Sequence, residues 1–72
     1  MNSTELKVEM LRNGDTADDL AKALGCTRAT LYNKMNRNNT DFDLGEMLII
    51  KERYHLSLER MVEIFFTEEV SA

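Results

Sequence analysis

The side chains best placed to do chemistry lie between Leu20 and Thr40, a segment with four cations and no acid. The rest of the chain holds five cations and thirteen acids, so charge is segregated within a net charge of −4. A basic stretch suits contact with a polyanion, whereas most charged runs are simply solvated helix faces. Both interpretations apply to the four cations, which are Lys22, Arg28, Lys34 and Arg37.

The other reactive side chains do not combine into a catalytic or metal site. Cys26 is the one cysteine, so it cannot close an intrachain disulfide, and with His55 it cannot complete a tetrahedral zinc site. We expect Cys26 to be a small buried filler and His55 to end a helix. Caps, a loop and the tail explain the paired acids, Asp18-Asp19, Asp41-Asp43 and Glu68-Glu69. The sequence therefore predicts no enzyme, no cofactor, no metal and no small-molecule substrate.

Length and composition indicate one small helical domain. The chain has 72 residues, 43% of them hydrophobic and 31% charged, and no proline. A chain of this length buries only about 60% of its unfolded surface and has no room for a separate effector domain. No apolar run approaches the roughly 20 residues of a membrane-spanning helix, and no signal peptide is evident. We therefore expect a cytoplasmic protein, in a bacterial or phage-infected cell, that contacts no membrane.

Five short helices must position these side chains, so the predicted fold is all-α, with a single domain over residues 1–72. Apolar spacing and helix stop signals place the helices at about 4–13, 17–24, 28–36, 44–54 and 58–66, followed by a tail at 67–72. Ser3 or Thr4 is expected to cap the first helix, and Gly25 to end the second in a left-handed conformation. The other predicted caps are Thr16, Thr27, Asp43 and Ser57, with Asp19 and Glu46 completing capping boxes.

Helical periodicity also predicts which side chains are buried. The expected inward-facing residues are Leu6, Met10 and Leu11, then Leu20, Ala21 and Leu24, then Leu31 and Met35, and finally Leu44, Met47, Leu48 and Tyr54.

The segment 17–35, ADDLAKALGCTRATLYNKM, resembles the helix-turn-helix of the Cro and phage-repressor (Xre-like) family of transcription regulators. The resemblance rests on Ala21 at the helix crossing, Gly25 in the turn, the capping Thr27, and the apolar contacts Leu20, Leu24 and Leu31. It implies a five-helix phage-repressor-like domain with the helix-turn-helix in the second and third helices. Members of the family often carry Gln at the start of the second helix, where this chain has Ala17 followed by Asp18 and Asp19.

The resemblance further implies that the third helix, 28–36, enters the major groove of a double-stranded DNA operator. Arginine can bond guanine O6 and N7 together, asparagine can bond adenine, and methyl groups can touch thymine. The residues expected to contact bases are Arg28, Ala29, Thr30 and Asn33. Those expected to contact phosphates are Thr16, Thr27, Tyr32, Lys34, Arg37 and Asn38.

The last predicted helix has more apolar side chains than one face can bury, because a helix turns 100° per residue. They are Met61, Val62, Ile64, Phe65 and Phe66. One interpretation is a patch for self-association or for a protein partner. The other is that Phe65 fills the gap against the first helix and the rest are incidental. A two-fold homodimer would place two recognition helices about 34–36 Å apart on DNA.

These observations predict a sequence-specific DNA-binding transcription regulator of phage or prophage Cro/repressor type. The alternative is a protein-binding modulator, antirepressor-like or antitoxin-like, that keeps the helix-turn-helix scaffold but acts by binding another regulator. The net charge of −4, Asp18-Asp19 and the apolar last helix favour this alternative.

Overall fold

The chain folds into short helices that each begin where a polar side chain caps the first turn. The computed structural model describes residues 1–36 and 42–67. In these ranges the helices are α1 (Ser3–Arg12), α2 (Ala17–Leu24), α3 (Arg28–Met35), α4 (Leu44–Arg53) and α5 (Leu58–Phe65), with no strand. The predicted all-α fold is confirmed.

Four of the five predicted N-caps are confirmed. Thr16 and Asp43 each form a complete capping box, with Asp19 and Glu46 respectively. Thr27 caps α3, and Ser57 caps α5. The prediction for α1 was wrong: Asn2 is the cap, its side chain accepts from the Glu5 N–H at 3.3 Å, and Ser3 is already helical.

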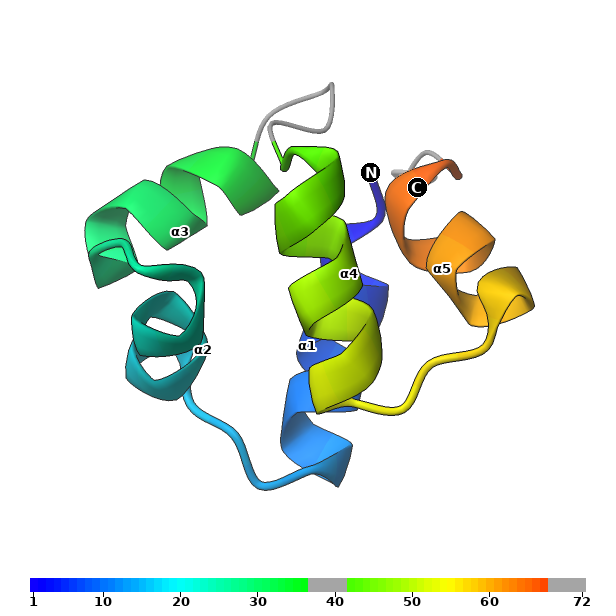
Figure 1. The fold of residues 1–72 in the computed structure, drawn as a ribbon, viewed down its shortest axis with the longest axis horizontal. Helices are drawn as coiled ribbons and strands as arrows, with labels where there is room; N and C mark the ends of the chain where they lie inside the picture. The colour runs from blue at the N-terminus through cyan, green and yellow to red at the C-terminus, as the bar shows by residue number, and fades with distance from the viewer. Residues whose placement is uncertain (37–41, 68–72) are drawn as a thin grey trace.

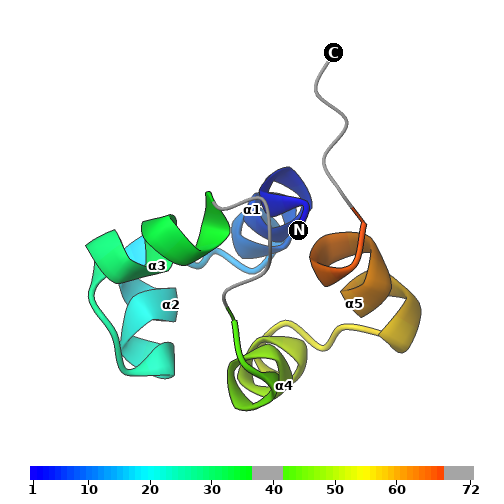
Figure 2. The same ribbon diagram turned by 90° about the horizontal axis from the view of Figure 1, so that it is seen from above.

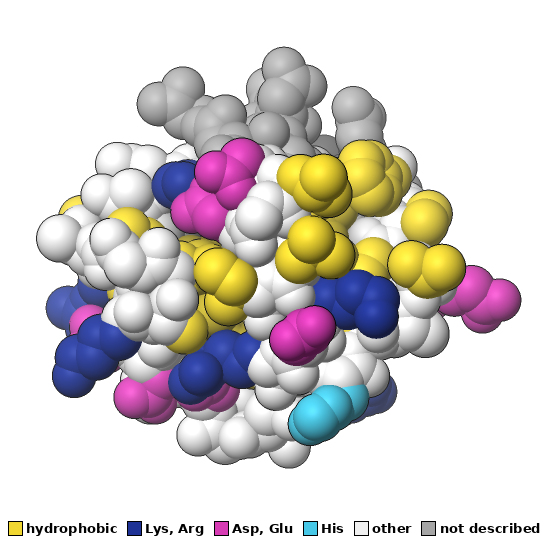
Figure 3. Space-filling view, in the orientation of Figure 1, with side chains coloured by type: hydrophobic (Ala, Val, Ile, Leu, Met, Phe, Trp, Pro, Cys, Tyr) yellow, Lys and Arg dark blue, Asp and Glu magenta, His cyan; other side chains and the backbone are white. Residues whose placement is uncertain are grey.

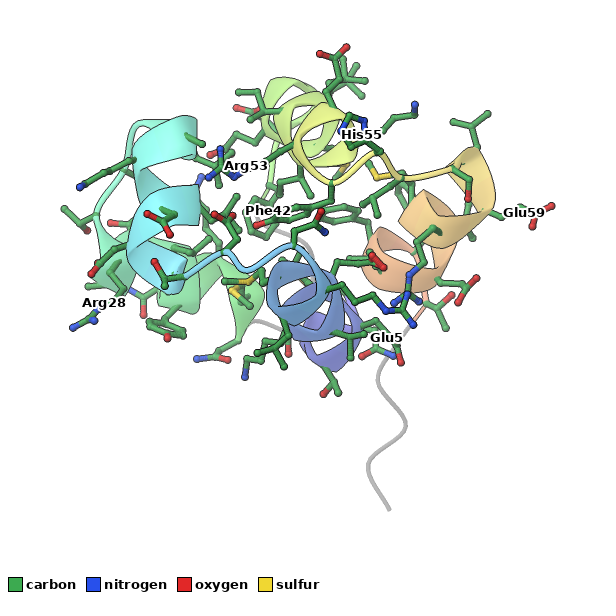
Figure 4. All side chains as sticks on the ribbon, turned by 90° about the horizontal axis from the view of Figure 1, so that it is seen from below. Glu5, Arg28, Phe42, Arg53, His55 and Glu59 are labelled. Atoms are coloured by element: carbon green, nitrogen blue, oxygen red, sulfur yellow. The ribbon has the colours of Figure 1, made fainter. Side chains whose placement is uncertain are left out.

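The helices form two groups around a shared core. Figures 1 and 2 show α2 and α3 together on one side, while α1, α4 and α5 form the rest of the molecule. The largest fully buried core side chains come from all five helices and are Leu6, Leu20, Leu31, Met35, Ile50 and Ile64. Phe42 packs edge-on against Phe65 at 5.7 Å between ring centroids, which links the start of α4 to α5. Phe42 lies in the interior of the stick view in Figure 4.

Three leucines predicted to be buried are exposed instead. Leu11 is 81% exposed, Leu44 72% and Leu48 50%. In α1 the buried side is formed by Leu6, Met10 and the carboxylate residue Glu9, which leaves Leu11 outside. In α4 the fully buried residue is Ile50, two positions and thus about 200° away from Leu48. Tyr54 and Met47, which were also expected to face inward, do pack on this buried side, so the prediction for α4 was wrong only for Leu44 and Leu48.

Ion pairs join α5 to α1 within the larger group. The Arg60 guanidinium bonds three acids, with distances of 2.8 Å to Glu5, 3.4 Å to Glu9 and 3.1 Å to Glu63. It thereby joins α5 to α1, where Glu5 is labelled in Figure 4. A backbone hydrogen bond joins the same two helices: the N–H of Asn2, the N-cap of α1, donates to the carbonyl of Ile64 in α5 at 2.7 Å.

A second polar cluster attaches the loop before α2 to the end of α4. Arg53 donates from Nε and Nη2 to the two Asp15 carboxylate oxygens at 2.8 and 2.7 Å, and the Tyr54 hydroxyl donates to Asp15 at 2.5 Å. The Arg53 bonds lower the pKa of Asp15, while burial and the Asp15 bond raise the pKa of Tyr54. This cluster sets where α2 begins relative to α4.

The chain continues from α4 into α5 through His55, which adopts a left-handed φ of 54° directly after the α4 C-cap Tyr54. His55 therefore ends the helix, as predicted. Within residues 1–36 and 42–67, no helix has the length and hydropathy to cross a membrane. In the same ranges no three His, Cys, Asp or Glu side chains are grouped as a metal site.

Candidate nucleic-acid interface

The helix-turn-helix is formed by α2, a tight turn and α3. Gly25 takes a left-handed φ of 73° at the end of α2, as predicted, and the Cys26 N–H donates to the Ala21 carbonyl at 2.9 Å. Ala21 is 2% exposed, so the two helices leave little space at that position. Cys26 is partly buried against the core, in agreement with its expected role as a small filler.

The outer face of α3 presents the side chains predicted to read bases. Leu31 and Met35, four residues apart, are buried and fix the inward face of this helix. The opposite face is exposed over the first turns, where it carries Arg28, Ala29, Thr30, Tyr32 and Asn33. The face therefore offers a guanidinium, an amide, a methyl group and two hydroxyls to a ligand, which is the donor and acceptor set that base edges require.

The cap of α3 restricts two of these side chains. The Thr27 hydroxyl accepts from the Thr30 N–H at 3.2 Å and donates to the Thr30 hydroxyl at 3.0 Å. Both threonines remain exposed. Because Thr27 fixes the orientation of the Thr30 oxygen, the Thr30 hydroxyl hydrogen and methyl group are the parts left for a ligand.

The start of α2 presents negative charge to any approaching phosphate. Asp19 accepts from the Thr16 N–H at 3.1 Å and from the Thr16 hydroxyl at 2.8 Å, and these bonds lower the pKa of Asp19. The Thr16 hydroxyl was predicted to contact a phosphate, but it donates its one hydrogen to the Asp19 carboxylate instead. Asp18, next to it, is 63% exposed.

Arg28 has an acidic neighbour, Asp18, that helical spacing does not predict. The Arg28 Nε lies 3.8 Å from Asp18 Oδ1, with the two side chains 61% and 63% exposed. Figure 4 shows Arg28 at the outer edge of the α2–α3 group. The pair joins the first turns of the two helices across the helix-turn-helix, and both groups remain open to solvent.

Lys34 is paired with Glu46, so its ammonium is not free for the predicted phosphate contact. Its ammonium bonds both carboxylate oxygens of Glu46 at 2.7 and 2.8 Å and lies 5.8 Å from the Phe42 ring centroid. The Glu46 bond raises the pKa of Lys34, and the Lys34 side chain is only 22% exposed. The partner is twelve residues away across the loop from α3 to α4, a separation that no helical or capping pattern predicts.

The predicted phosphate contacts Arg37 and Asn38 lie outside the described residues. Between Thr16 and Asn36 the chain carries three cations and two acids, the cations being Lys22, Arg28 and Lys34. With Lys34 paired to Glu46, the described part of this face is close to neutral.

The predicted patch on the last helix requires correction. Met61, Ile64 and Phe65 are core residues, between 0% and 8% exposed, so they are not part of a surface. Val62 and Phe66 are exposed, and they align with Leu58 at intervals of four residues. Together with Leu44 and Leu48 of α4 they form what we call the α4–α5 apolar face, with exposures of 72% (Leu44), 50% (Leu48), 75% (Leu58), 51% (Val62) and 69% (Phe66). Figure 3 shows hydrophobic side chains gathered over α4 and α5.

Comparison with protein families identifies the helix-turn-helix. The family described as the helix-turn-helix domain of resolvase matches residues 1–38, which include α1, α2 and α3. No curated protein matches the chain, and no solved structure does. The match supports a helix-turn-helix DNA-binding domain and does not single out the Cro and phage-repressor family.

Proposed function

Because the chain belongs to the family of the helix-turn-helix domain of resolvase, we propose that it is a sequence-specific DNA-binding transcription regulator with α3 as its recognition helix. The observation that carries the proposal is the exposed outer face of α3, with Arg28, Ala29, Thr30 and Asn33 above the buried Leu31 and Met35. These four side chains are the proposed base contacts. Action of the phage Cro/repressor type, by occupying an operator, follows from the resemblance and is part of the proposal.

The structure supports some of the predicted phosphate contacts less well than others. Thr27 and Tyr32 are exposed and keep this role, and Arg37 and Asn38 remain proposed contacts. Thr16 and Lys34 are weaker candidates, because each is bonded to a carboxylate. Because the described cations of α3 are both paired with acids, a single copy gains little salt-dependent affinity from this part of the helix-turn-helix.

Binding-site selection tests this function without knowledge of the operator. The full chain is used to enrich a random duplex library, and wild type is compared with Arg28→Ala on the enriched site by fluorescence anisotropy. Loss of a bidentate guanine contact is worth about 1–3 kcal/mol, so we expect affinity to fall roughly 5-fold to 150-fold. Lys7→Ala on α1 is the matched control, since it removes one exposed cation outside the helix-turn-helix. Failure to enrich any sequence, or equal losses in the two variants, would contradict the proposal.

We propose that the α4–α5 apolar face binds a second copy of the chain. The face lies on helices other than the recognition helix, so both surfaces can be used together. Two copies on a two-fold DNA site would make twice as many DNA contacts as one copy, which offsets the weak attraction of a nearly neutral interface for phosphates. Leu58→Asp is a suitable test, because an acid in the first turn of α5 is favoured by the helix dipole and does not weaken the helix.

Sedimentation velocity measures this assembly directly. Wild type is expected to sediment as a dimer and Leu58→Asp as a monomer. Leu11→Asp, which changes an exposed leucine of α1, should keep the wild-type state. A monomeric wild type at all concentrations would contradict the homodimer.

In the alternative function, the chain is a modulator that binds another regulator through the α4–α5 apolar face. The specific observations in its favour are the weak net charge of the helix-turn-helix and the exposure of five large apolar side chains on that face. It predicts a monomer that enriches no DNA sequence and whose regulatory effect is lost in Leu58→Asp but kept in Arg28→Ala. The two binding experiments above therefore separate the two functions.

A further inference from the structure

Asp18 is the acidic side chain nearest to the proposed base-reading arginine. It lies in the first turn of α2, at the second helical position, while Thr16 and Asp19 form the capping box without it. Its carboxylate faces Arg28, the first residue of α3, at 3.8 Å from Nε. The capping function of this turn is therefore complete without Asp18, and the charge of Asp18 is directed toward the recognition helix.

We propose that Asp18 is a specificity-determining residue that orients Arg28 toward a guanine and penalises DNA that lacks one at that position. The inference rests on the proposed function, in which Arg28 reads a base. The guanidinium is a planar fork with donors on two edges. The Asp18 carboxylate lies 3.8 Å from Nε, so in the proposed complex it would take the Nε edge of the fork and leave the two terminal nitrogens to bond guanine O6 and N7 together.

The penalty arises from the charge of Asp18 in the complex. In the free protein both side chains are more than half exposed, so the pair is loose and weak. DNA excludes water from the contact and strengthens every charge interaction in it. When a guanine is present, Arg28 stays beside Asp18 and neutralises it. When another base is present and Arg28 turns to a phosphate, the carboxylate is left unpaired next to the polyanion, which disfavours the complex.

This arrangement gives a physical reason for an acid at the DNA-facing start of α2. A carboxylate there lowers affinity for all DNA, but it lowers it least for the sequence that keeps Arg28 in place. Discrimination depends on the difference between two affinities and not on either one alone. Asp18 therefore lowers the affinity for non-specific DNA and raises the selectivity for the preferred site.

The test compares two duplexes and four proteins, namely wild type, Asp18→Asn, Arg28→Ala and a charge control. The duplexes are the enriched site and the same site with the guanine opposite Arg28 replaced by adenine. Asp18→Asn keeps the size and the acceptor oxygen but removes the charge, so affinity for the replaced duplex should rise about fivefold and affinity for the enriched site should change less than about twofold. The ratio of the two affinities should consequently fall. Glu59→Gln on α5 is the matched control: it makes the same charge change at the far end of the molecule from Arg28 in Figure 4.

The outcomes separate this inference from the proposed function. If Asp18→Asn raises both affinities by the same factor, as a distant charge change would, Asp18 acts only through net charge and the inference is overturned. If wild type discriminates between the duplexes, Arg28→Ala abolishes that discrimination and Asp18→Asn leaves it intact, the inference fails and the proposed function stands. If wild type does not discriminate between the duplexes, Arg28 does not read that base, and the inference fails together with the base contact proposed for Arg28. Thermal unfolding by circular dichroism confirms that Asp18→Asn is folded.

Discussion

The helix-turn-helix group and the group of α1, α4 and α5 use their charged side chains in opposite ways. Arg60 and Arg53 of the second group bond carboxylates at 2.7–2.8 Å, and their side chains are 17% and 35% exposed. Arg28 of the first group meets its one acidic neighbour at 3.8 Å and is 61% exposed. Close, half-buried pairs hold helices in place, whereas an open and loosely paired arginine can exchange its partner for a ligand. Lys34 is the exception, because it lies on the proposed recognition helix but is paired with a carboxylate at close range, as the arginines of the second group are.

The largest expected effect comes from removing the core contact that both groups share. Leu31 is fully buried on the inner face of α3, so Leu31→Ala leaves a cavity and should destabilise the domain by about 2–5 kcal/mol. A loss of this size is a large fraction of the stability of a small domain and should unfold it partly or wholly. The measurement is urea unfolding followed by circular dichroism. Leu11→Ala, at a leucine 81% exposed, should change stability by less than about 0.5 kcal/mol. Similar losses in the two variants would show that α3 is not packed as described.

A smaller effect is expected from the scaffold cluster of Asp15, Arg53 and Tyr54. Tyr54→Phe removes one hydrogen bond to a partly buried carboxylate and should cost about 1.5–3 kcal/mol near pH 7. Tyr32→Phe is the matched control, since Tyr32 is exposed on α3 and should be close to neutral. Equal effects of the two changes would mean that the cluster contributes no more to stability than a solvated hydroxyl.

The same cluster predicts how stability depends on pH. The pKa of Asp15 is lowered by Arg53, so its contribution is present above the unfolded value of about 3.9 and is lost as pH falls through the folded value. The pKa of Tyr54 is raised by burial, so its contribution is complete below about pH 10 and is lost as pH rises toward the folded value. Unfolding free energies from pH 2 to 11 should therefore decline at both ends for wild type. In Tyr54→Phe the unfolding free energy should fall less steeply at alkaline pH, because the hydroxyl that titrates there is absent.

Local features of the fold were predictable from the sequence, and features that depend on distant contacts were not. Thr16, Thr27, Asp43 and Ser57 were identified as caps because each acts within three residues of itself along the chain. The turn at Gly25 follows from backbone sterics alone.

The errors concern side chains whose surroundings are formed by other helices. α4 has two apolar stripes, and only the packing against the other helices decides that Ile50 is buried while Leu44 and Leu48 are exposed. The same holds for the site: exposure of Arg28 and Asn33 followed from helical periodicity, whereas the pairing of Lys34 with Glu46 joins residues that no short-range rule connects. The α4–α5 apolar face was predicted only in part for this reason: Val62 and Phe66 were expected in a patch, whereas Leu44 and Leu48 belong to a second helix and were expected to be buried.

The smallest expected effect tests the one exception in the comparison, the pairing of Lys34. Glu46→Gln removes the charge that holds Lys34 but keeps an oxygen that can accept from the Asp43 N–H, so the capping box of α4 is retained. If Glu46 withholds Lys34 from DNA, the released ammonium should gain one phosphate contact, and the slope of log affinity against log salt should steepen by about 0.9. Fluorescence anisotropy at several salt concentrations measures this slope.

The double variant Glu46→Gln with Lys34→Gln isolates the lysine. It should return the slope to the wild-type value or below, because no ammonium remains to be released. An unchanged slope in Glu46→Gln, combined with a shallower slope in Lys34→Gln, would mean that Lys34 leaves Glu46 whenever DNA is bound. Lys34 would then belong with Arg28 among the side chains that exchange their partners, and the original expectation of a phosphate contact would be correct. Equal slopes in all three variants would instead assign Lys34 and Glu46 entirely to the scaffold, as a clamp between α3 and α4.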